Sequence, residues 1–496
     1  MKNVMSFIKT CFLFLIFIAV SLTVFSTSLF LNDSYFVNND TISNDITQIA
    51  LGELYPLMFD VYDVTFSFQN GDSFVFDENI TEKFFDIYLS TTPDGTLIFN
   101  GNKIESISIK GEKCDISDLE IWIGWEGEKE LKNVINSFSL KFGIKIKTLY
   151  VPNSYSKLIS YIRSNKILPD IVMVESDDIS TLMESKAIQN LDYIFNSSEE
   201  NGSFFDKLKE SFILGDKTWA YPFYADTHLI LYNRKLIDFK NNTDSYKTLT
   251  LNDLKNMDEY VLAKEIIPIS WNAYSGYFFL PFMMGFGKEN FIEKDGTVRV
   301  NDVSSLKAIE YILTLEKESI LDISERDAMT ALFLEEKTSA IIGGSYMIPY
   351  LKSLGIDLGI LTLPYNEADN CYIPPLLDIK GFAITRKSKN PVLSRRLIQY
   401  ITNQKNQEEF CGELFKIPCR SEALDKIYAN NGDGEDYSEK LRISVENGIA
   451  IPADKAYSVY KSTMWNILRF AISGQMKPQE ALDTAQNIID NNLKSR

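Results

Sequence analysis

The chain has almost no histidine, and His228 is the only one among its 496 residues. A Ser-His-Asp or Cys-His catalytic arrangement would have to use His228, and a zinc or iron site built on imidazoles lacks its usual ligands. The flanking sequence "ADTHLILYN" is apolar and favours a packing role for His228 in a strand. We therefore expect no catalytic residue, no metal and no cofactor.

A phosphate-binding loop and an excess of basic residues are also missing. No G-x-x-x-x-G-K-[ST] motif occurs, so ATP hydrolysis is not expected. The chain has 50 Lys and Arg against 68 Asp and Glu, and its net charge of -18 repels phosphate backbones. Nucleic acid is therefore not an expected partner. Asp177 and Asp226 could serve an exported glycosidase as acid and base, but carboxylate pairs are common among so many acidic residues.

Cysteine is scarce as well. Beyond Cys11, the chain has Cys114, Cys371, Cys411 and Cys419, and none of them forms a closely spaced metal-binding pair. Cys411 and Cys419 are eight residues apart, so a disulfide between them is conceivable in an oxidising compartment. The sequence favours the simpler interpretation that they are small buried side chains.

The first residues predict export. Lys2 and Lys9 precede the apolar run "CFLFLIFIAVSLTVF", and no charged residue follows Lys9 before Asp33. Residues 1–28 are expected to be a signal peptide or signal anchor, because the uncharged stretch 10–32 is long enough to span a bilayer uncleaved. The chain is then expected at the periplasmic or extracellular face of the cytoplasmic membrane. Cys11 begins the apolar run, which disfavours a lipid anchor on it.

The pattern of the remaining chain changes near residue 116. Residues 29–115 alternate apolar and polar residues around turn signals such as Asn-Gly, which predicts a small β-rich segment. From Leu119 onward, strand-like and helix-like stretches alternate, which is typical of an α/β fold. "LEIWIGW" predicts a strand, and the helical stripe of "EKELKNVINSFSLKF" follows it. "PVLSRRLIQYITNQKNQEEFCGEL" predicts one long helix that begins at Pro391.

Several loops at strand ends combine aromatic rings with hydrogen-bonding groups. A pyranose suits such loops, because its C–H face packs on a ring and its hydroxyls need directional partners such as carboxylates. Ligands of open α/β sheets bind outside the carboxyl ends of the strands. The expected ligand-binding residues are Trp125, Glu126, Asp177, Asp178, Tyr224, Asp226, Trp271, Tyr274, Tyr277 and Tyr346.

At these residues the chain resembles the family 1 extracellular solute-binding proteins, the maltose- and oligosaccharide-binding type that serves ABC transporters. The resemblance runs from Leu119 to Leu493 in six ordered blocks. They include "IWIGWEGEKELKNVINSFSLKFGIKIK", "LPDIVMVESDDISTLMESKAIQNLD", "WAYPFYADTHLILYNRKLI", "FLEEKTSAIIGGSYMIPYLKSLGIDLGILTLP" and "MWNILRFAISGQMKPQEALDTAQNII". The segment before Leu119 has no counterpart in the family.

The resemblance implies a two-lobed α/β fold of the periplasmic-binding-protein type (type II), with crossing segments at the hinge and the ligand between the lobes. Lobe 1 is expected at 116–224 and 376–424, and lobe 2 at 225–375 and 425–496. The implied protein is not an enzyme. It is expected to be a monomer that captures a sugar, closes around it and docks on separate permease subunits of the transporter.

The resemblance also implies roles for single residues. Glu126 matches a polar ligand group of the first loop, Asp177 a sugar-binding carboxylate and Asp226 a hinge-side acid. Tyr277 matches a stacking aromatic, and Tyr346 stands where a Gly-Pro-Trp motif places its tryptophan. Asp178 and Val174 stand where maltodextrin-specific members have a basic and an aromatic residue.

Three alternatives keep the fold and change the task. The acidic loops also suit a polyamine, whose affinity would fall steeply with salt. A group of tyrosines could hold a ferric ion, and a membrane-tethered protein could pass ligand occupancy to a sensor partner. Within the first loop, Trp125 and Glu126 are expected to face the ligand, whereas Trp122 on the strand is expected to pack in the core.

Overall fold

A computed structural model describes residues 118–142, 144–191, 204–237, 239, 249–293, 297–429 and 437–494, together with the backbone of seven strands between Thr41 and Gly111. The expected signal peptide or anchor at 1–28 lies outside the described residues, as does Cys114. Among the helices of the described residues, none is long and apolar enough to cross a membrane.

The strands before residue 112 form two small antiparallel sheets. One has the order β1-β7-β3-β4 and the other the order β2-β6-β5. Their bounds are Thr41–Ile42 for β1, Gln48–Ala50 for β2, Val61–Phe68 for β3, Ser73–Phe76 for β4, Leu89–Thr91 for β5, Thr96–Phe99 for β6 and Ile104–Gly111 for β7. They lie within the segment whose alternating sequence predicts β structure.

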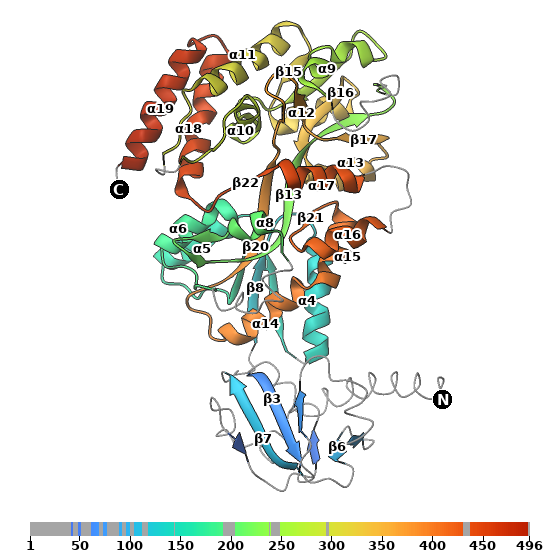
Figure 1. Cartoon of the computed structure of the whole chain (residues 1–496), viewed down its shortest axis with the longest axis vertical. Helices are drawn as coiled ribbons and strands as arrows, with labels where there is room; N and C mark the ends of the chain where they lie inside the picture. Colours follow the sequence, from blue (N-terminus) through green and yellow to red (C-terminus); the bar gives the residue numbers. More distant parts are fainter. Residues whose placement is uncertain are drawn as a thin grey trace. The chain divides into compact units, whose positions relative to one another are not determined.

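The chain divides into two compact units. Unit 1 contains residues 1–172 and 384–401, and unit 2 contains residues 173–383 and 402–496. The elements of both units are labelled in Figure 1, where colour follows the sequence.

In unit 1, β8 (Leu119–Ile123) pairs in parallel with β9 (Ile146–Tyr150) on one edge. On its other edge it pairs in parallel with the first residues of β10 (Ile171–Glu175). The helices that the described residues of unit 1 form are α4 (Glu128–Phe142), α5 (Ser154–Arg163) and α14 (Pro391–Ile401). α4 packs against β9 and α14. This strand-helix alternation is the arrangement that the sequence predicts from Leu119 onward.

The core of unit 1 follows from the period of its side chains. On α4, Leu131, Ile135 and Phe138 recur at helical spacing and are buried, whereas the polar residues Asn133, Asn136 and Ser137 between them are exposed. Trp122 on β8 is 1% exposed and meets the ring of Tyr161 edge-on at 5.2 Å. The prediction that Trp122 packs in the core is therefore confirmed.

Unit 2 is built on the strand order β15-β14-β16-β13-β20. β14 runs parallel to β15 and β16, whereas β13 is antiparallel to both β16 and β20. The bounds are Tyr221–Asn233 for β13, Ile267–Trp271 for β14, Leu321–Ile323 for β15, Thr338–Gly344 for β16 and Leu376–Ile384 for β20. β17 (Leu358–Leu361) and β21 (Ile417–Pro418) also pair with β13, and β22 (Ile449–Ala450) pairs with β20.

Among the described residues, β13 is the longest strand, and 12 of its 13 residues are buried. A strand covered on both faces reads as a continuous apolar run instead of an alternating one. This burial explains why "ADTHLILYN" is apolar around His228, which lies inside β13 as the sequence predicts.

Helices cover the strands of unit 2. α18 (Lys455–Ile472) packs along α19 (Pro478–Lys494), and α10 (Gly276–Gly285) packs against both α18 and α11 (Val303–Lys317), which agrees with their placement in Figure 1. The remaining helices are η2 (Ser176–Asp178), α6 (Ile179–Glu184), α8 (Asp206–Glu210), α9 (Leu251–Lys255), η4 (Met257–Tyr260), α12 (Arg326–Leu334), η5 (Ser345–Met347), α13 (Ile348–Ser353), α15 (Gln404–Leu414), α16 (Ser421–Ala429) and α17 (Tyr437–Asn447). Two further short hairpins pair β11 (Ile213–Leu214) with β12 (Lys217–Thr218) and β18 (Tyr365–Asn366) with β19 (Cys371–Tyr372).

The prediction of one long helix after Pro391 is wrong in one respect. Pro391 does begin a helix, but α14 ends at Ile401 and a second helix, α15, begins at Gln404. Asn403 is the N-cap of α15, and its side chain accepts a hydrogen bond from the N–H of Asn406. An Asn that bonds the backbone at a helix start competes with continued helix, which is why the periodic pattern alone misses the break.

Cys411 and Cys419 are both buried and both free thiols. Burial raises the pKa of each thiol well above its usual value. The simpler interpretation of small buried side chains is therefore the correct one.

Candidate functional site

Acidic side chains and tyrosines from distant parts of the sequence converge within unit 2. The cluster is formed by Glu175 at the end of β10, Asp177 and Asp178 in η2, Tyr277 on α10, Tyr346 in η5, Asp378 and Lys380 on β20, and Tyr457 and Lys461 on α18. We call these nine residues the acid-tyrosine cluster.

The first three carboxylates of the cluster owe their positions to a tight helical start. Glu175 and Asp178 form a capping box, in which the backbone N–H of Glu175 donates to Asp178 Oδ2 at 3.4 Å. Acidic side chains are stable at such a start because its N–H groups lack partners within the helix. Burial, and then the charges of Asp177 and Glu175, raises the pKa of Asp178 well above its usual value.

Lys380 connects two of the carboxylates. Its Nζ lies 3.1 Å from Glu175 Oε1 and 2.6 Å from Asp378 Oδ2, with only 3% of its side chain exposed. Burial opposes the charge of Lys380, but the two acids more than compensate and raise its pKa well above the usual value. The pKa of Asp378 still rises to about 6, because burial and the charge of Glu175 outweigh the attraction of Lys380.

Helix α18 contributes a lysine and a tyrosine one turn apart. Lys461 Nζ donates to Asp177 Oδ2 at 2.6 Å, and the same ammonium lies 5.5 Å from the centre of the Tyr457 ring. The Tyr457 side chain is fully buried, and its hydroxyl has no hydrogen-bond partner among the described residues. Burial, and then the charges of Asp177 and Asp378, raises the pKa of Tyr457.

Helix α10 contributes Tyr277 to the cluster. Burial, followed by the charge of Asp378 and the neighbouring Tyr346, raises its pKa well above the usual value. The ring of Tyr277 meets His228 edge-on at 4.3 Å, and His228 stacks on Phe278 at 4.7 Å. Two rings thus contact the imidazole, and burial lowers the pKa of His228 to about 3.

A buried ion pair lies near the cluster, since the charge of Asp226 acts on both Asp378 and Lys380. Lys416 Nζ donates to Asp226 at 2.8 and 3.1 Å, and both side chains are almost completely buried. Ser345 Oγ donates to Asp226 Oδ1 at 2.7 Å and accepts from the N–H of Thr227 at 3.2 Å. Since Ser345 begins η5, this network fixes the element that carries Tyr346.

The other predicted residues of unit 2 are not members of the acid-tyrosine cluster. Trp271 and Tyr224 are fully buried, with Trp271 stacked on Phe282 at 5.5 Å and Tyr224 next to Lys416. Tyr274 is half-buried, and the guanidinium of Arg469 lies 4.9 Å from its ring. Trp271 and Tyr224 are in packing positions, and a direct ligand contact by either remains a prediction.

In unit 1, the loop between β8 and α4 holds Trp125 and Glu126 as expected. Trp125 is half-buried and has φ 61°, whereas Glu126 is exposed. A left-handed backbone at a bulky residue costs free energy and is enriched at functional sites. Burial, and then the charges of Glu126 and Glu128, raises the pKa of Tyr150, which places Glu126 near that ring.

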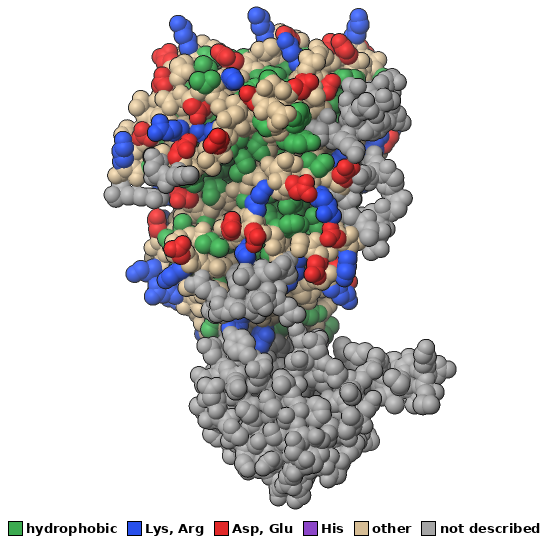
Figure 2. Space-filling model, in the orientation of Figure 1, with side chains coloured by type: hydrophobic (Ala, Val, Ile, Leu, Met, Phe, Trp, Pro, Cys, Tyr) green, Lys and Arg blue, Asp and Glu red, His purple; other side chains and the backbone are tan. Residues whose placement is uncertain are grey.

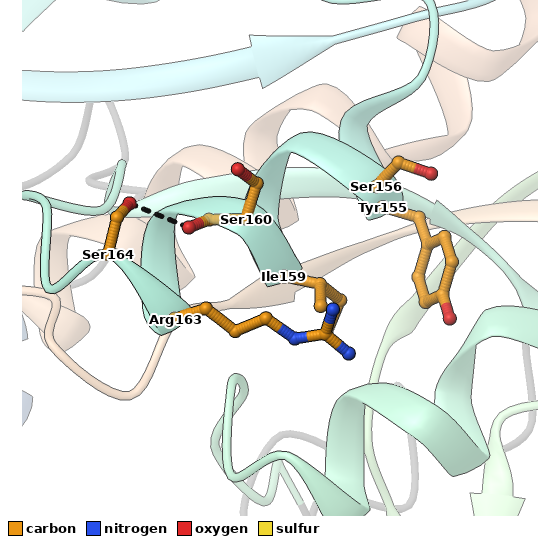
Figure 3. A pocket seen from close by; sticks show the side chains of 6 residues that line it. All are labelled: Tyr155, Ser156, Ile159, Ser160, Arg163 and Ser164. Atoms are coloured by element: carbon orange, nitrogen blue, oxygen red, sulfur yellow. Dashed lines mark hydrogen bonds between the residues drawn. The ribbon is translucent and has the colours of Figure 1, made fainter.

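Unit 1 also has a surface hollow of about 500 Å³, drawn in Figure 3. A single helix, α5, and its cap line the hollow, through Tyr155, Ser156, Ile159, Ser160, Arg163 and Ser164. Figure 3 shows the Arg163 side chain extending along Ile159, with Ser164 bonded to the carbonyl of Ser160. Residues expected to bind the ligand are absent from its lining, so we assign it no role.

The arrangement in unit 2 suits binding better than acid-base catalysis. Asp177 and Asp226, the acid and base of the glycosidase alternative, each hold an ion pair with a lysine. Within the described residues, no group of His, Cys, Asp and Glu could hold a metal ion. On the face drawn in Figure 2, basic and acidic side chains are interspersed, so this face offers no uniform field to a polyanion.

Sequence reasoning found Asp177, Asp178, Tyr277 and Tyr346 but missed the rest of the cluster. Glu175 is the last residue of the predicted strand "PDIVMVE", so its position at a strand end was a usable signal. Asp378 and Lys380 are charged residues inside the buried strand β20, a combination that calls for internal partners. Lys461 lies 284 residues from its partner Asp177, and only the tertiary structure reveals that contact.

Comparison with known families gives one match that covers most of the chain. The profile of the bacterial extracellular solute-binding proteins matches residues 133–436. In sequence, the chain is similar to the galactooligosaccharide-binding protein of Bacillus subtilis, with 23% identity over 412 residues that cover 77% of this chain and 90% of the relative.

Solved structures give the same result for the fold. The GacH receptor of Streptomyces glaucescens, solved unliganded and with acarbose, is 18% identical and has a TM-score of 0.67 over 77% of this chain and 99% of its own. An extracellular solute-binding protein from Staphylococcus aureus, solved with maltose, is 22% identical with a TM-score of 0.62 over 77% and 99% of the two chains. These similarities show an α/β fold of the periplasmic-binding-protein type.

Proposed function

Since the chain belongs to the bacterial extracellular solute-binding protein family, we propose that it captures a carbohydrate and delivers it to the permease of an ABC transporter. The relative in Bacillus subtilis is named for galactooligosaccharides, and the two similar structures hold acarbose and maltose. An oligosaccharide is therefore the proposed class of ligand. The proposed partners are separate permease subunits in the membrane.

The observation that carries this proposal is the acid-tyrosine cluster. Carboxylates accept hydrogen bonds from sugar hydroxyls, and the rings of Tyr277, Tyr346 and Tyr457 suit the C–H faces of a sugar. Asp177 and Asp178 follow the end of β10, where ligands of α/β sheets are typically bound. Trp125 and Glu126 are proposed as further ligand contacts from the loop after β8.

Capture is proposed to depend on two lobes, at 116–224 with 376–424 and at 225–375 with 425–496. Two of the three proposed crossings fall at long strands, since β13 includes residues 224 and 225 and β20 begins at residue 376. A ligand that contacts both lobes favours the closed form by the difference in its contacts with the two forms. The permease then recognises the closed form.

The first part of the chain is proposed to hold the protein at the membrane. Residues 1–28 are proposed as a signal peptide or an uncleaved anchor, and residues 29–115 as a spacer between the membrane and the lobes. The protein is proposed to act as a monomer on the outer face of the cytoplasmic membrane.

A thermal-shift screen of the purified full-length chain tests the proposal. A ligand that binds only the folded state raises the melting temperature by mass action. We expect a shift with one family of oligosaccharides, and we expect Tyr277→Ala to abolish it while Tyr155→Ala in the hollow of α5 retains it. If none of the mono- or oligosaccharides shifts the melting temperature at concentrations up to the millimolar range, the carbohydrate function is wrong.

A further inference from the structure

The carboxylates of the acid-tyrosine cluster outnumber the ammonium groups that pair with them. Glu175, Asp177, Asp178 and Asp378 are joined by only two lysines, Lys380 and Lys461. The nearby pair of Asp226 and Lys416 is balanced by itself and supplies no spare positive charge. When all four carboxylates are ionised, the cluster therefore has two negative charges in excess.

Asp178 is the carboxylate that lacks a lysine. Its side chain accepts the hydrogen bond from the N–H of Glu175, and no lysine or arginine of the described residues forms an ion pair with it. Asp177 beside it has Lys461 at 2.6 Å, so the two neighbours differ sharply in their surroundings. Asp178 as a whole residue is half-buried, in contrast to the buried Asp177.

The cluster also has a buried polar group without a partner. The hydroxyl of Tyr457 is fully buried and has no hydrogen-bond partner among the described residues. The charges of Asp177, Asp378 and Glu175 act on the Tyr457 hydroxyl, so this hydroxyl lies near the carboxylates of the cluster. Leaving such a group unpaired costs free energy, which points to an external molecule that supplies a hydrogen-bond partner.

Charge and hydrogen bonding can be satisfied together by one kind of ligand. We propose that the acid-tyrosine cluster binds a sugar that carries a protonated amine, with the ammonium donating to Asp178 and a sugar hydroxyl bonding to Tyr457. This inference rests on the proposed carbohydrate function and adds the charge class of the ligand.

The chemistry of an ammonium group fits this position. It brings a positive charge and three donors to a carboxylate that has neither a lysine nor a side-chain donor. Tyrosine rings attract cations through their faces, as the Lys461 ammonium near the Tyr457 ring already illustrates. A hydroxyl or an acetylated amine at the same place would leave the charge excess uncompensated, so uncharged analogues are expected to bind more weakly.

Matched sugars separate the contribution of charge from that of shape. Isothermal titration of the full-length chain, at a pH slightly below neutral, compares glucosamine with N-acetylglucosamine and glucose. A second series compares the disaccharides chitobiose, diacetylchitobiose and cellobiose, and spermidine serves as a cation without a sugar ring. In at least one series we expect the free amine to bind about tenfold more tightly or better than its uncharged analogues. This preference should shrink as salt is added, because salt screens the charge pair.

Two variants assign the preference to one carboxylate. Asp178→Asn should bind the amine and its uncharged analogue with similar affinity, because the amide can still accept the N–H of Glu175 but has no charge. Asp258→Asn is the matched control, since Asp258 also lies in a short 3-10 helix of unit 2 but is exposed. The control should keep the full preference of the wild type.

The outcomes distinguish this inference from the function on which it rests. Tighter binding of uncharged sugars, or an amine preference that survives Asp178→Asn, overturns the inference and leaves the carbohydrate function in place. Binding of spermidine with no binding of any sugar overturns both and favours a polyamine receptor. If Asp178→Asn does not fold, the wild-type comparison of amine and uncharged sugars at low and high salt decides by itself.

Discussion

Replacement of the single histidine offers a direct test of how the interior of unit 2 is built. His228 is fully buried between Tyr277 and Phe278, and neither ring nitrogen has a hydrogen-bond partner among the described residues. A buried polar group without a partner typically costs about 1–3 kcal/mol. His228→Phe removes that cost and keeps an aromatic ring against both neighbours, although the larger ring adds a packing term of its own.

The pH dependence of stability separates these two contributions. Burial holds the folded-state pKa of His228 at about 3, against about 6.5 for an unfolded chain. Between these values the unfolded state binds the extra proton, so stability is fully present above pH 6.5 and is lost as pH falls. The loss approaches about 1.4 kcal/mol per pH unit, or roughly 2 kcal/mol between pH 6.5 and 5.

The measurement is the free energy of unfolding in urea at several pH values between 7.5 and 5. Because His228 is the only histidine, neither His228→Phe nor His228→Leu retains an imidazole. The two variants pack differently, and this changes the free energy of unfolding of each by an amount that does not depend on pH. Both variants should nevertheless lose the same pH-dependent part of the wild-type curve. If either variant keeps the wild-type slope below pH 6.5, the imidazole is not held neutral by burial and the reasoning is refuted.

Three further predictions concern the ligand loop, the buried ion pair and the acid-tyrosine cluster. Trp125→Ala should weaken binding of the sugar found in the thermal-shift screen by about 0.5–1.5 kcal/mol, because a ring contact is lost. Unchanged affinity in a titration would contradict its role. Lys416→Met should lower the free energy of unfolding by about 3–5 kcal/mol, because Asp226 is left charged and buried, and the loss should be largely recovered in a double variant with Asp226→Leu. Asp378 has a folded-state pKa of about 6, above its usual 3.8, so the folded state binds the proton more tightly and stability rises as pH falls through this window. Asp378→Asn should remove this rise, which amounts to at most about 3 kcal/mol, and an unchanged pH profile of urea unfolding would show that Asp378 does not titrate there.

Much of the fold can be predicted from local sequence pattern. The strand "LEIWI" and the helical stripe of Leu131, Ile135 and Phe138 appear where their periods predict them, because each period reflects one buried face of one element. The apolar surroundings of His228 likewise predict a buried strand. The family follows from six such stretches in the correct order.

Local pattern fails where one residue interrupts a period. The run after Pro391 remains amphipathic across Thr402 and Asn403, yet the Asn403 side chain ends one helix and begins another. The same limit applies to single aromatic residues. Tyr277 borders the cluster, whereas the equally promising Trp271 stacks on Phe282 in the core, and loop composition does not distinguish them.

The sequence by itself determined the fold class and the family, because composition, period and the order of motifs are properties of the linear chain. Only the tertiary structure decided which charges meet. It pairs Asp177 with Lys461 across 284 residues and leaves Asp178, the next residue, without a lysine. Ion pairing depends on distances of a few ångströms between side chains of different elements, and such distances exist only after the strands and helices have packed.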